Sequence, residues 1–217
     1  MLKGVIFDMD GVLVDSHPIH VRAWKRLLEG LGRTAEDQEL EVVRDGKTKQ
    51  EILRHLLGEL SEDQVRGYSQ EKDRLFNEEM QSIRIIHGVR QLLNDLSRAA
   101  IPAAVASSGS SWRVHHILDL LELRGYFAAV VTGDEFKAGK SDPAIFRRAA
   151  ERIDVRSQES LVFEDSVSGV QSASALGMKC LGIADKMRAK GLLDAGARHV
   201  YPDFRSTSLR QLHSLFA

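Results

Sequence analysis

The sequence predicts an α/β fold in which a doubly wound parallel sheet carries a small inserted helical domain. Short runs rich in valine and isoleucine recur along most of the chain, helical patterns separate them, and one long helical block follows the first run. Strands that alternate with helices are typical of a parallel sheet covered on both faces. Such sheets bind ligands in the loops beyond the carboxyl ends of their strands.

Five apolar runs are the candidate strands. They are KGVIF at 3–7, IPAAVAS at 101–107, AAVVTG at 128–133, SLVFED at 160–165 and KCLGIAD at 179–185. Their length and their β-branched residues favour buried strands. Helical patterns begin near residues 88, 110, 142 and 166. We therefore expect a strand–helix alternation over the second part of the chain.

From about residue 17 to about residue 82 the chain shows only helical patterning. Its last helix is expected to begin after Ser61, because acidic residues follow that serine in the first turn. A helical block of this size, inserted after the first strand, indicates a separate small domain. We predict a core made of 1–15 and 84–217, and a helical cap made of 16–83.

Composition excludes several classes of protein. The chain has 217 residues, of which 43% are hydrophobic and 28% charged, as in an ordinary globular protein. The net charge is −1 and the basic residues are spread, so we expect no nucleic-acid partner. We expect no membrane partner, since the apolar runs are shorter than the roughly 18 residues that span a bilayer. The single cysteine, Cys180, predicts a reducing, cytoplasmic location, and we expect a monomer.

Polar side chains stand at or just beyond the ends of the predicted strands. They are Asp8 and Asp10 after the first, Ser107 and Ser108 at the second, Lys140 in the loop after the third, and Glu164 with Asp165 at the fourth. Because parallel strands share one carboxyl edge, we expect these groups to converge. A cluster of carboxylates is tolerated where a divalent cation neutralises it, and hard oxygen ligands suit Mg²⁺.

This combination of groups favours phosphoryl transfer, in which positioning and charge neutralisation carry most of the catalysis. Asp8 is the candidate nucleophile that would form an aspartyl-phosphate, and Asp10 the candidate acid/base. Ser107 and nearby backbone amides would hold the phosphoryl oxygens, and Lys140 would offset their charge. Asp8, Asp165 and Glu164 would bind the metal.

Four motifs, DMDGVLVDS at 8–16, ASSGS at 106–110, GKSDP at 139–143 and FEDS at 163–166, resemble those of the haloacid-dehalogenase-like phosphohydrolases with a helical cap. The resemblance implies a Rossmann-like core, Mg²⁺ dependence and an aspartyl-phosphate intermediate. It also implies particular roles: Asp8 as nucleophile and metal ligand, Asp10 as acid/base with a backbone metal contact, Ser107 and Lys140 at the phosphate, and Asp165 at the metal.

Within that family, HVRAWK at 20–25 resembles the branch of β-phosphoglucomutase and the sugar-phosphate phosphatases. The resemblance places Lys49 where the mutase branch carries a substrate-binding arginine. His20 lies on a helix that is expected to start just beyond the hinge between the two domains. Ser108, His20 and Lys49 are therefore further substrate-binding candidates. Two residues depart from the family pattern, namely His87 and Ser141, which stand where proline is usual.

Each motif taken alone also has a structural explanation. Asp10 with Gly11 could form a turn, Ser107 or Ser108 could cap a helix, and Glu164 with Asp165 could cap the helix after them. The four motifs occur in the expected order, each at or beyond the end of a predicted strand, and this favours a catalytic site over four separate structural roles.

Three functions remain open. The first is a Mg²⁺-dependent phosphatase acting on a small phosphorylated metabolite, in particular a sugar phosphate. The second is a β-phosphoglucomutase-like phosphomutase, which is disfavoured because Ser110 and Ser111 replace a lysine and an asparagine. The third is a phosphate-accepting signalling receiver, which is disfavoured because receivers lack an inserted cap.

Overall fold

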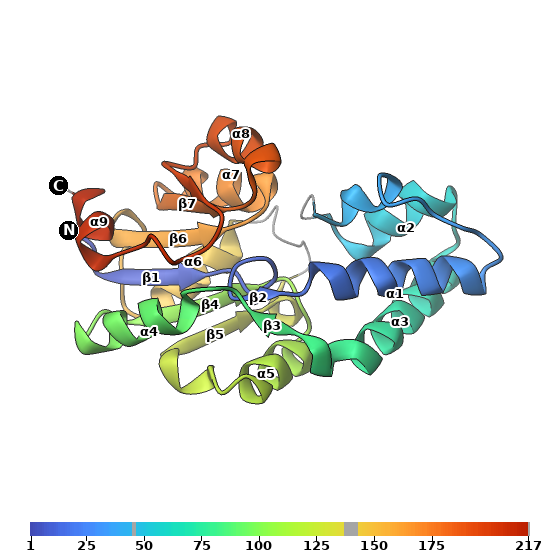
Figure 1. Ribbon diagram of the computed structural model, residues 1–217, viewed down its shortest axis with the longest axis horizontal. Coiled ribbons are helices and arrows are strands. Elements are labelled where there is room, and N and C mark those ends of the chain that lie inside the picture. Colours follow the sequence, from blue (N-terminus) through green and yellow to red (C-terminus); the bar gives the residue numbers. More distant parts are fainter. Residues whose placement is uncertain (45–46, 137–142, 217) are drawn as a thin grey trace. The chain divides into compact units, whose positions relative to one another are not determined.

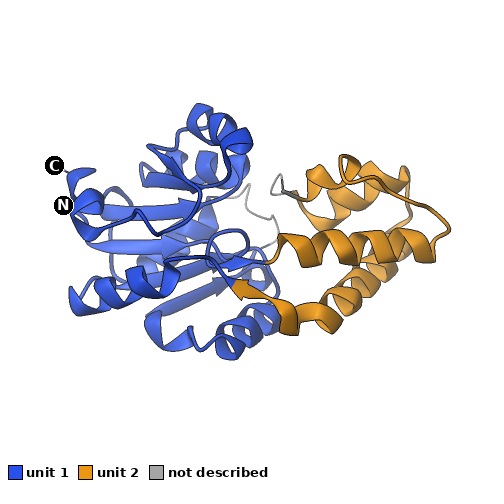
Figure 2. Ribbon diagram, viewed as in Figure 1, with its two compact units in different colours: residues 1–15, 85–217 blue, residues 16–84 orange. Residues whose placement is uncertain are grey.

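A computed structural model describes residues 1–44, 47–136 and 143–216 (Figure 1). The chain forms two compact units (Figure 2). Unit 1 consists of Met1–Asp15 and Ile85–Ala217, and unit 2 of Ser16–Arg84. Among the described residues, no helix has both the length and the apolar character required to cross a membrane.

Unit 1 is built on a six-stranded sheet with the order β5-β4-β1-β6-β7-β8. The strands are β1 (Gly4–Phe7), β4 (Ala103–Ser107), β5 (Ala129–Thr132), β6 (Ser160–Glu164), β7 (Lys179–Ile183) and β8 (Val200–Tyr201). Every pairing between neighbours is parallel. The predicted α/β fold is confirmed, and each of the five apolar runs contains one strand. The edge strand β8 was not predicted, because a two-residue strand carries no periodic signal.

Helices cover the sheet of unit 1 on both faces. They are α4 (Val89–Arg98), α5 (Ser111–Leu120), α6 (Ala144–Arg152), α7 (Val167–Ala175), α8 (Lys186–Asp194) and α9 (Leu209–Ser214), with short 3-10 turns η3 (Arg124–Tyr126), η4 (Gly133–Glu135) and η5 (Ser157–Glu159). Ile6 and Val162 point to one face, where they join a buried cluster with residues of α6, α7 and α8. Phe7 and Phe163 point to the other face, where their rings stack 5.2 Å apart.

Unit 2 contains α1 (His17–Gly30), η1 (Glu39–Arg44), α2 (Lys49–Leu57), α3 (Glu62–Glu79) and η2 (Met80–Ser82). Its helices pack around Trp24, Leu53 and Phe76, each at most 1% exposed. As the sequence predicts, α3 begins after Ser61, whose hydroxyl accepts a hydrogen bond from the Gln64 amide. Two short strands, β2 (Val14–Asp15) and β3 (Arg84–Ile85), pair where the chain passes between the units.

Two methionines of unit 1 offer a matched test of its packing. Met178 is 5% exposed and belongs to the buried cluster, whereas Met187 is 92% exposed. We expect Met178→Ala to lower the free energy of unfolding by about 2–5 kcal/mol, since it leaves a cavity. Met187→Ala should change it by less than about 0.5 kcal/mol. Denaturant unfolding of both variants measures the difference, and equal effects would contradict the packing described.

Candidate active site

The register of the sheet brings those predicted site residues that follow β1, β4 and β6 to one edge. In β1, Phe7 pairs with Val105 of β4 on one side and with Phe163 of β6 on the other. Asp8 follows directly, and its amide donates to the Phe163 carbonyl at 3.0 Å. The carboxyl ends of these three adjacent strands therefore place Asp8 between Ser107 and Glu164.

Asp8, Glu164 and Asp165 form an acidic cluster at this edge. Each offers a carboxylate oxygen, and these three oxygens lie within 4.8 Å of one another. Asp8 and Glu164 are 0% exposed. One oxygen of Glu164, Oε2, accepts a hydrogen bond from the Ser166 amide at 2.5 Å. An all-oxygen set of this size and charge fits a hard divalent cation.

Asp165 is held from two sides. Arg188 of α8 lies with Nη1 3.6 Å from Oδ2 of Asp165, and its Nη2 donates to the Asp165 carbonyl at 2.8 Å. On the other side lies Gly11, whose φ is +78°. A Cβ atom at Gly11 would stand 2.2 Å from Oδ2 of Asp165. Glycine is thus required there, both by its backbone conformation and by the close approach of a candidate metal ligand.

The carboxylate of Asp10 points to a different partner. Both of its oxygens accept hydrogen bonds from Arg113 of α5, at 3.1 and 2.8 Å. The Asp10 side chain is 22% exposed, so it is more accessible than that of Asp8. The structure thus gathers the three carboxylates that are predicted to bind the metal, whereas the carboxylate of Asp10, whose predicted metal contact is through its backbone, is bound by an arginine.

The turn after β4 carries the predicted hydroxyl groups. Ser107 is 0% exposed, and its Oγ accepts a hydrogen bond from the Gly109 amide at 3.2 Å. Ser108 is exposed. The N-cap of α5 is Ser110, whose hydroxyl accepts from the Arg113 amide at 3.4 Å. Neither Ser107 nor Ser108 therefore serves as that cap.

The acidic cluster and the turn after β4 do not account for Lys140, His20 and Lys49. Lys140, like Ser141, is outside the described residues, so the structure does not place it. His20 and Lys49 belong to unit 2. Lys49 forms an ion pair with Asp73 of α3. His20 accepts at Nδ1 a hydrogen bond of 2.7 Å from Lys72, which is 3% exposed.

Three basic residues that contact predicted site residues were missed from the sequence: Lys72 in unit 2, and Arg113 and Arg188 in unit 1. Lys72 lies on α3. The helical periodicity of the sequence shows only whether a residue faces the core or the solvent, so it does not reveal a lysine that binds a histidine. The two arginines lie on helices after β4 and β7, and only the fold brings them to carboxylates.

The cysteine of unit 1, Cys180, does not act as a nucleophile. Cys180 lies on β7 and is 1% exposed. Burial, with a smaller effect of the Glu164 charge, raises the pKa of its thiol well above the ordinary value. The thiol is therefore protonated at neutral pH and is not a nucleophile.

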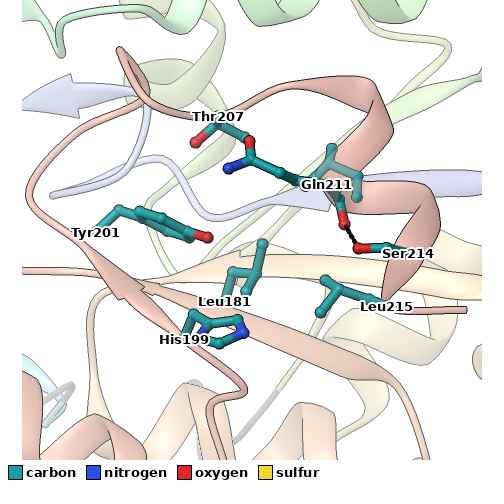
Figure 3. Close-up of a pocket in the computed structure, with 8 residues that line it drawn as sticks. Leu181, His199, Tyr201, Thr207, Gln211, Ser214 and Leu215 are labelled. Carbon is teal, nitrogen blue, oxygen red and sulfur yellow. Dashed lines mark hydrogen bonds between the residues drawn. The ribbon is translucent and has the colours of Figure 1, made fainter.

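A pocket of about 190 Å³ lies apart from the acidic cluster (Figure 3). Its lining comes from β7, β8, α9 and the segments beside them, and includes His199, Tyr201, Thr207 and Gln211. It contains none of the residues that the sequence singled out.

Comparison with known proteins agrees with this geometry. A profile described as haloacid dehalogenase-like hydrolase matches residues 5–183. The chain belongs to this family. The match begins in β1 and ends with β7, so it spans the acidic cluster, Ser107 and the whole of unit 2.

Several members of the family resemble this hydrolase closely. A protein named phosphorylated carbohydrates phosphatase, from Thermotoga maritima, is 34% identical over 90% of this chain and 92% of its own length. Hexitol phosphatase A of Escherichia coli is 32% identical over 83% of this chain and 82% of its own. Among solved structures, a family IA hydrolase from Entamoeba histolytica has a TM-score of 0.90 and 26% identity, and covers 99% of both chains.

A β-phosphoglucomutase from Clostridium difficile has a TM-score of 0.85 at 22% identity, with 99% of this chain and 96% of its own covered. This likeness shows the fold alone.

The acidic cluster predicts cation binding that can be measured without any substrate. We expect Mg²⁺ to bind the purified protein in a calorimetric titration. Asp165→Asn should weaken binding by more than the roughly 10- to 100-fold that the loss of an outer-shell partner costs.

Asp154→Asn is the matched control for this titration. Asp154 is exposed and has a positive φ of 56°, which asparagine tolerates. Binding that is the same in wild type and both variants would contradict a site at this cluster.

Proposed function

We propose that this hydrolase is a Mg²⁺-dependent phosphatase that removes phosphate from a small sugar phosphate through an aspartyl-phosphate on Asp8. One observation carries the proposal: a fully buried aspartate stands at the end of the sheet's central strand, within an acidic cluster and next to the strand that ends in Ser107. Relatives named as phosphatases, at 34% and 32% identity, support the same activity.

Asp8 is suited to attack phosphorus. Its position at the end of a buried strand fixes the direction of the carboxylate, and positioning supplies much of the rate of phosphoryl transfer. A bound Mg²⁺, held by Asp8, Glu164 and Asp165, would neutralise charge on the phosphoryl oxygens and on the nucleophile. Ser107 and the amides of the turn after it would donate hydrogen bonds to the same oxygens.

Asp10 is the proposed acid/base. It is more exposed than Asp8, and it lies two residues further along the same loop. In the first step it would protonate the departing sugar oxygen, and in the second it would take a proton from the water that attacks the aspartyl-phosphate. Lys140, in the GKSDP motif, is proposed to offset the phosphate charge.

Unit 2 is proposed to act as the cap that determines the substrate. Its Lys72, which is 3% exposed and hydrogen-bonded to His20, is proposed as a cation for a polar ligand. A sugar phosphate is favoured because relatives are named for phosphorylated carbohydrates, a hexitol and fructose 1-phosphate. The monomeric state and the cytoplasmic location stay predictions.

The nucleophile is tested by Asp8→Asn. We expect phosphate release from a panel of sugar phosphates with Mg²⁺ to fall by at least about 10³-fold, because the amide cannot form the covalent intermediate. Acid-quenched reactions with a radiolabelled ester should label Asp8 in the wild type. Asp154→Asn should retain full activity. Hydrolysis that survives in Asp8→Asn would refute the assignment.

A phosphomutase is the second candidate, since a buried cation in unit 2 could hold a second phosphate. The turn after β4 weighs against it. The hydroxyl of Ser110 caps α5 and so serves local structure, and the main-chain amide of Ser111 donates to Asp134 at 2.7 Å. Neither has a side chain long enough to reach far from the turn.

Glucose 1-phosphate with a bisphosphate primer separates the two functions. A phosphatase releases inorganic phosphate, whereas a mutase accumulates glucose 6-phosphate. We expect phosphate release to exceed isomer formation at all times. Faster accumulation of the isomer would establish the mutase instead.

A further inference from the structure

Arg113 and Asp10 form an ion pair that joins two separate parts of unit 1. Nη1 of Arg113 donates to Oδ1 of Asp10 at 3.1 Å, and Nη2 donates to Oδ2 at 2.8 Å. The two residues are 103 positions apart in sequence. Their side chains are 13% and 22% exposed, so water competes little for the bonds. Two parallel bonds of this kind fix the plane of a carboxylate as well as its distance.

The same guanidinium also packs against the turn after β4. A Cβ atom at Gly109 would stand 2.3 Å from Nη2 of Arg113 and 3.0 Å from its Cζ. The turn is itself tied to Ser107, whose Oγ accepts from the Gly109 amide. Arg113 therefore lies between the loop that carries Asp10 and the turn that carries the candidate phosphate-binding hydroxyl. Its direction is set by backbone on one side and by a carboxylate on the other.

The loop that carries Asp10 is fixed through its main chain. Asp10 follows the end of β1, and its main chain forms an isolated bridge with Val14. The backbone there is fixed by bonds such as that from the Gly11 amide to the Val14 carbonyl, at 2.8 Å. These bonds hold the main chain, whereas the bonds to Arg113 constrain the rotation of the side chain.

We propose that Arg113 is a positioning residue of the reaction, which holds the Asp10 carboxylate in the orientation needed toward the leaving oxygen. This inference rests on the proposed phosphatase function and on the role of Asp10 in it. Only an arginine can fill the role, because its planar fork bonds both carboxylate oxygens at once. Lysine would supply the charge without the orientation.

The ion pair between Arg188 and Asp165 constrains its carboxylate less than the pair between Arg113 and Asp10 does. Arg188 approaches Oδ2 of Asp165 at 3.6 Å, and its shorter bond, of 2.8 Å, goes to the main-chain carbonyl. Arg188 therefore offers mainly charge to that side chain. The geometry of Arg113 is different in kind, since both of its short bonds end on the carboxylate.

Kinetics with two leaving groups test the proposal. p-Nitrophenyl phosphate releases a stable phenolate that needs little protonation, whereas fructose 1-phosphate and glucose 6-phosphate release poor leaving groups. For the sugar phosphate that is turned over faster, Arg113→Gln and Arg113→Lys should lower kcat/KM by about 10²-fold, mainly through kcat. For p-nitrophenyl phosphate, the same variants should lower kcat/KM by no more than about threefold. Arg98→Gln, a change at a 79% exposed arginine, is the matched control.

A double variant shows whether Arg113 acts through Asp10. Once Asp10→Asn has removed the acid, Arg113→Gln should lower kcat/KM for the sugar phosphate by no more than about twofold further. Additive losses would overturn the proposal, as would equal losses on both esters, because they would show an independent electrostatic or structural role. Faster turnover by Arg113→Gln would also overturn it, because Arg113 would then restrain Asp10 instead of aligning it.

Crystal structures of Arg113→Gln and Arg113→Lys supply a readout that needs no activity. We expect the Asp10 side chain to turn to another rotamer or to show two, with the main chain of both units unchanged. An unaltered Asp10 orientation in both variants would overturn the proposal. If the wild type hydrolyses neither ester, the proposed function fails, while these structures still decide whether Arg113 orients Asp10. Arg113→Lys keeps the positive charge, so it still tests the proposal if Arg113→Gln does not fold.

Discussion

The mutual repulsion of three carboxylates governs this site. The ligand oxygens of Asp8, Glu164 and Asp165 lie within 4.8 Å of one another. Two like charges at that separation repel by about 3 kcal/mol at an effective dielectric constant near 20. The rest of unit 1 must overcome this cost, and a divalent cation converts it into attraction.

The burial of the central strands of the sheet supplies the stability that offsets the repulsion between the carboxylates. The side chains of Val5, Ile6 and Phe7 are 0% exposed, and β1 is bonded to β4 on one side and to β6 on the other. The backbone bonds that align these strands also fix the residues just beyond them. The helices then contribute cations to the carboxylates at this edge: Arg188 from α8 lies beside Asp165 of the cluster, and Arg113 from α5 binds the neighbouring Asp10.

Much of this could be predicted from the sequence, for physical reasons. Buried parallel strands are continuous apolar runs, so β1, β4, β5, β6 and β7 were visible, and their ends identified Asp8, Ser107, Glu164 and Asp165. The edge strand β8 and the helix α9 were not predicted, because elements of two and six residues carry weak patterns. The helix α8 was also missed, although it is as long as α6 and α7. Arg113 could not be recognised, since its function depends on a contact with a loop 103 residues away. Lys72 could not either, because a buried lysine on an otherwise polar helix looks like a solvent-exposed one.

The central claim is that the buried carboxylates hold a divalent cation at the strand ends. Anomalous diffraction from crystals soaked in MnCl₂ tests it most directly, since Mn²⁺ takes the same oxygen ligands as Mg²⁺ and can be located without ambiguity. The account predicts one strong peak bound by carboxylate oxygens of Asp8, Glu164 and Asp165. A peak bound only at other carboxylates, or an empty cluster at saturating Mn²⁺, would contradict it.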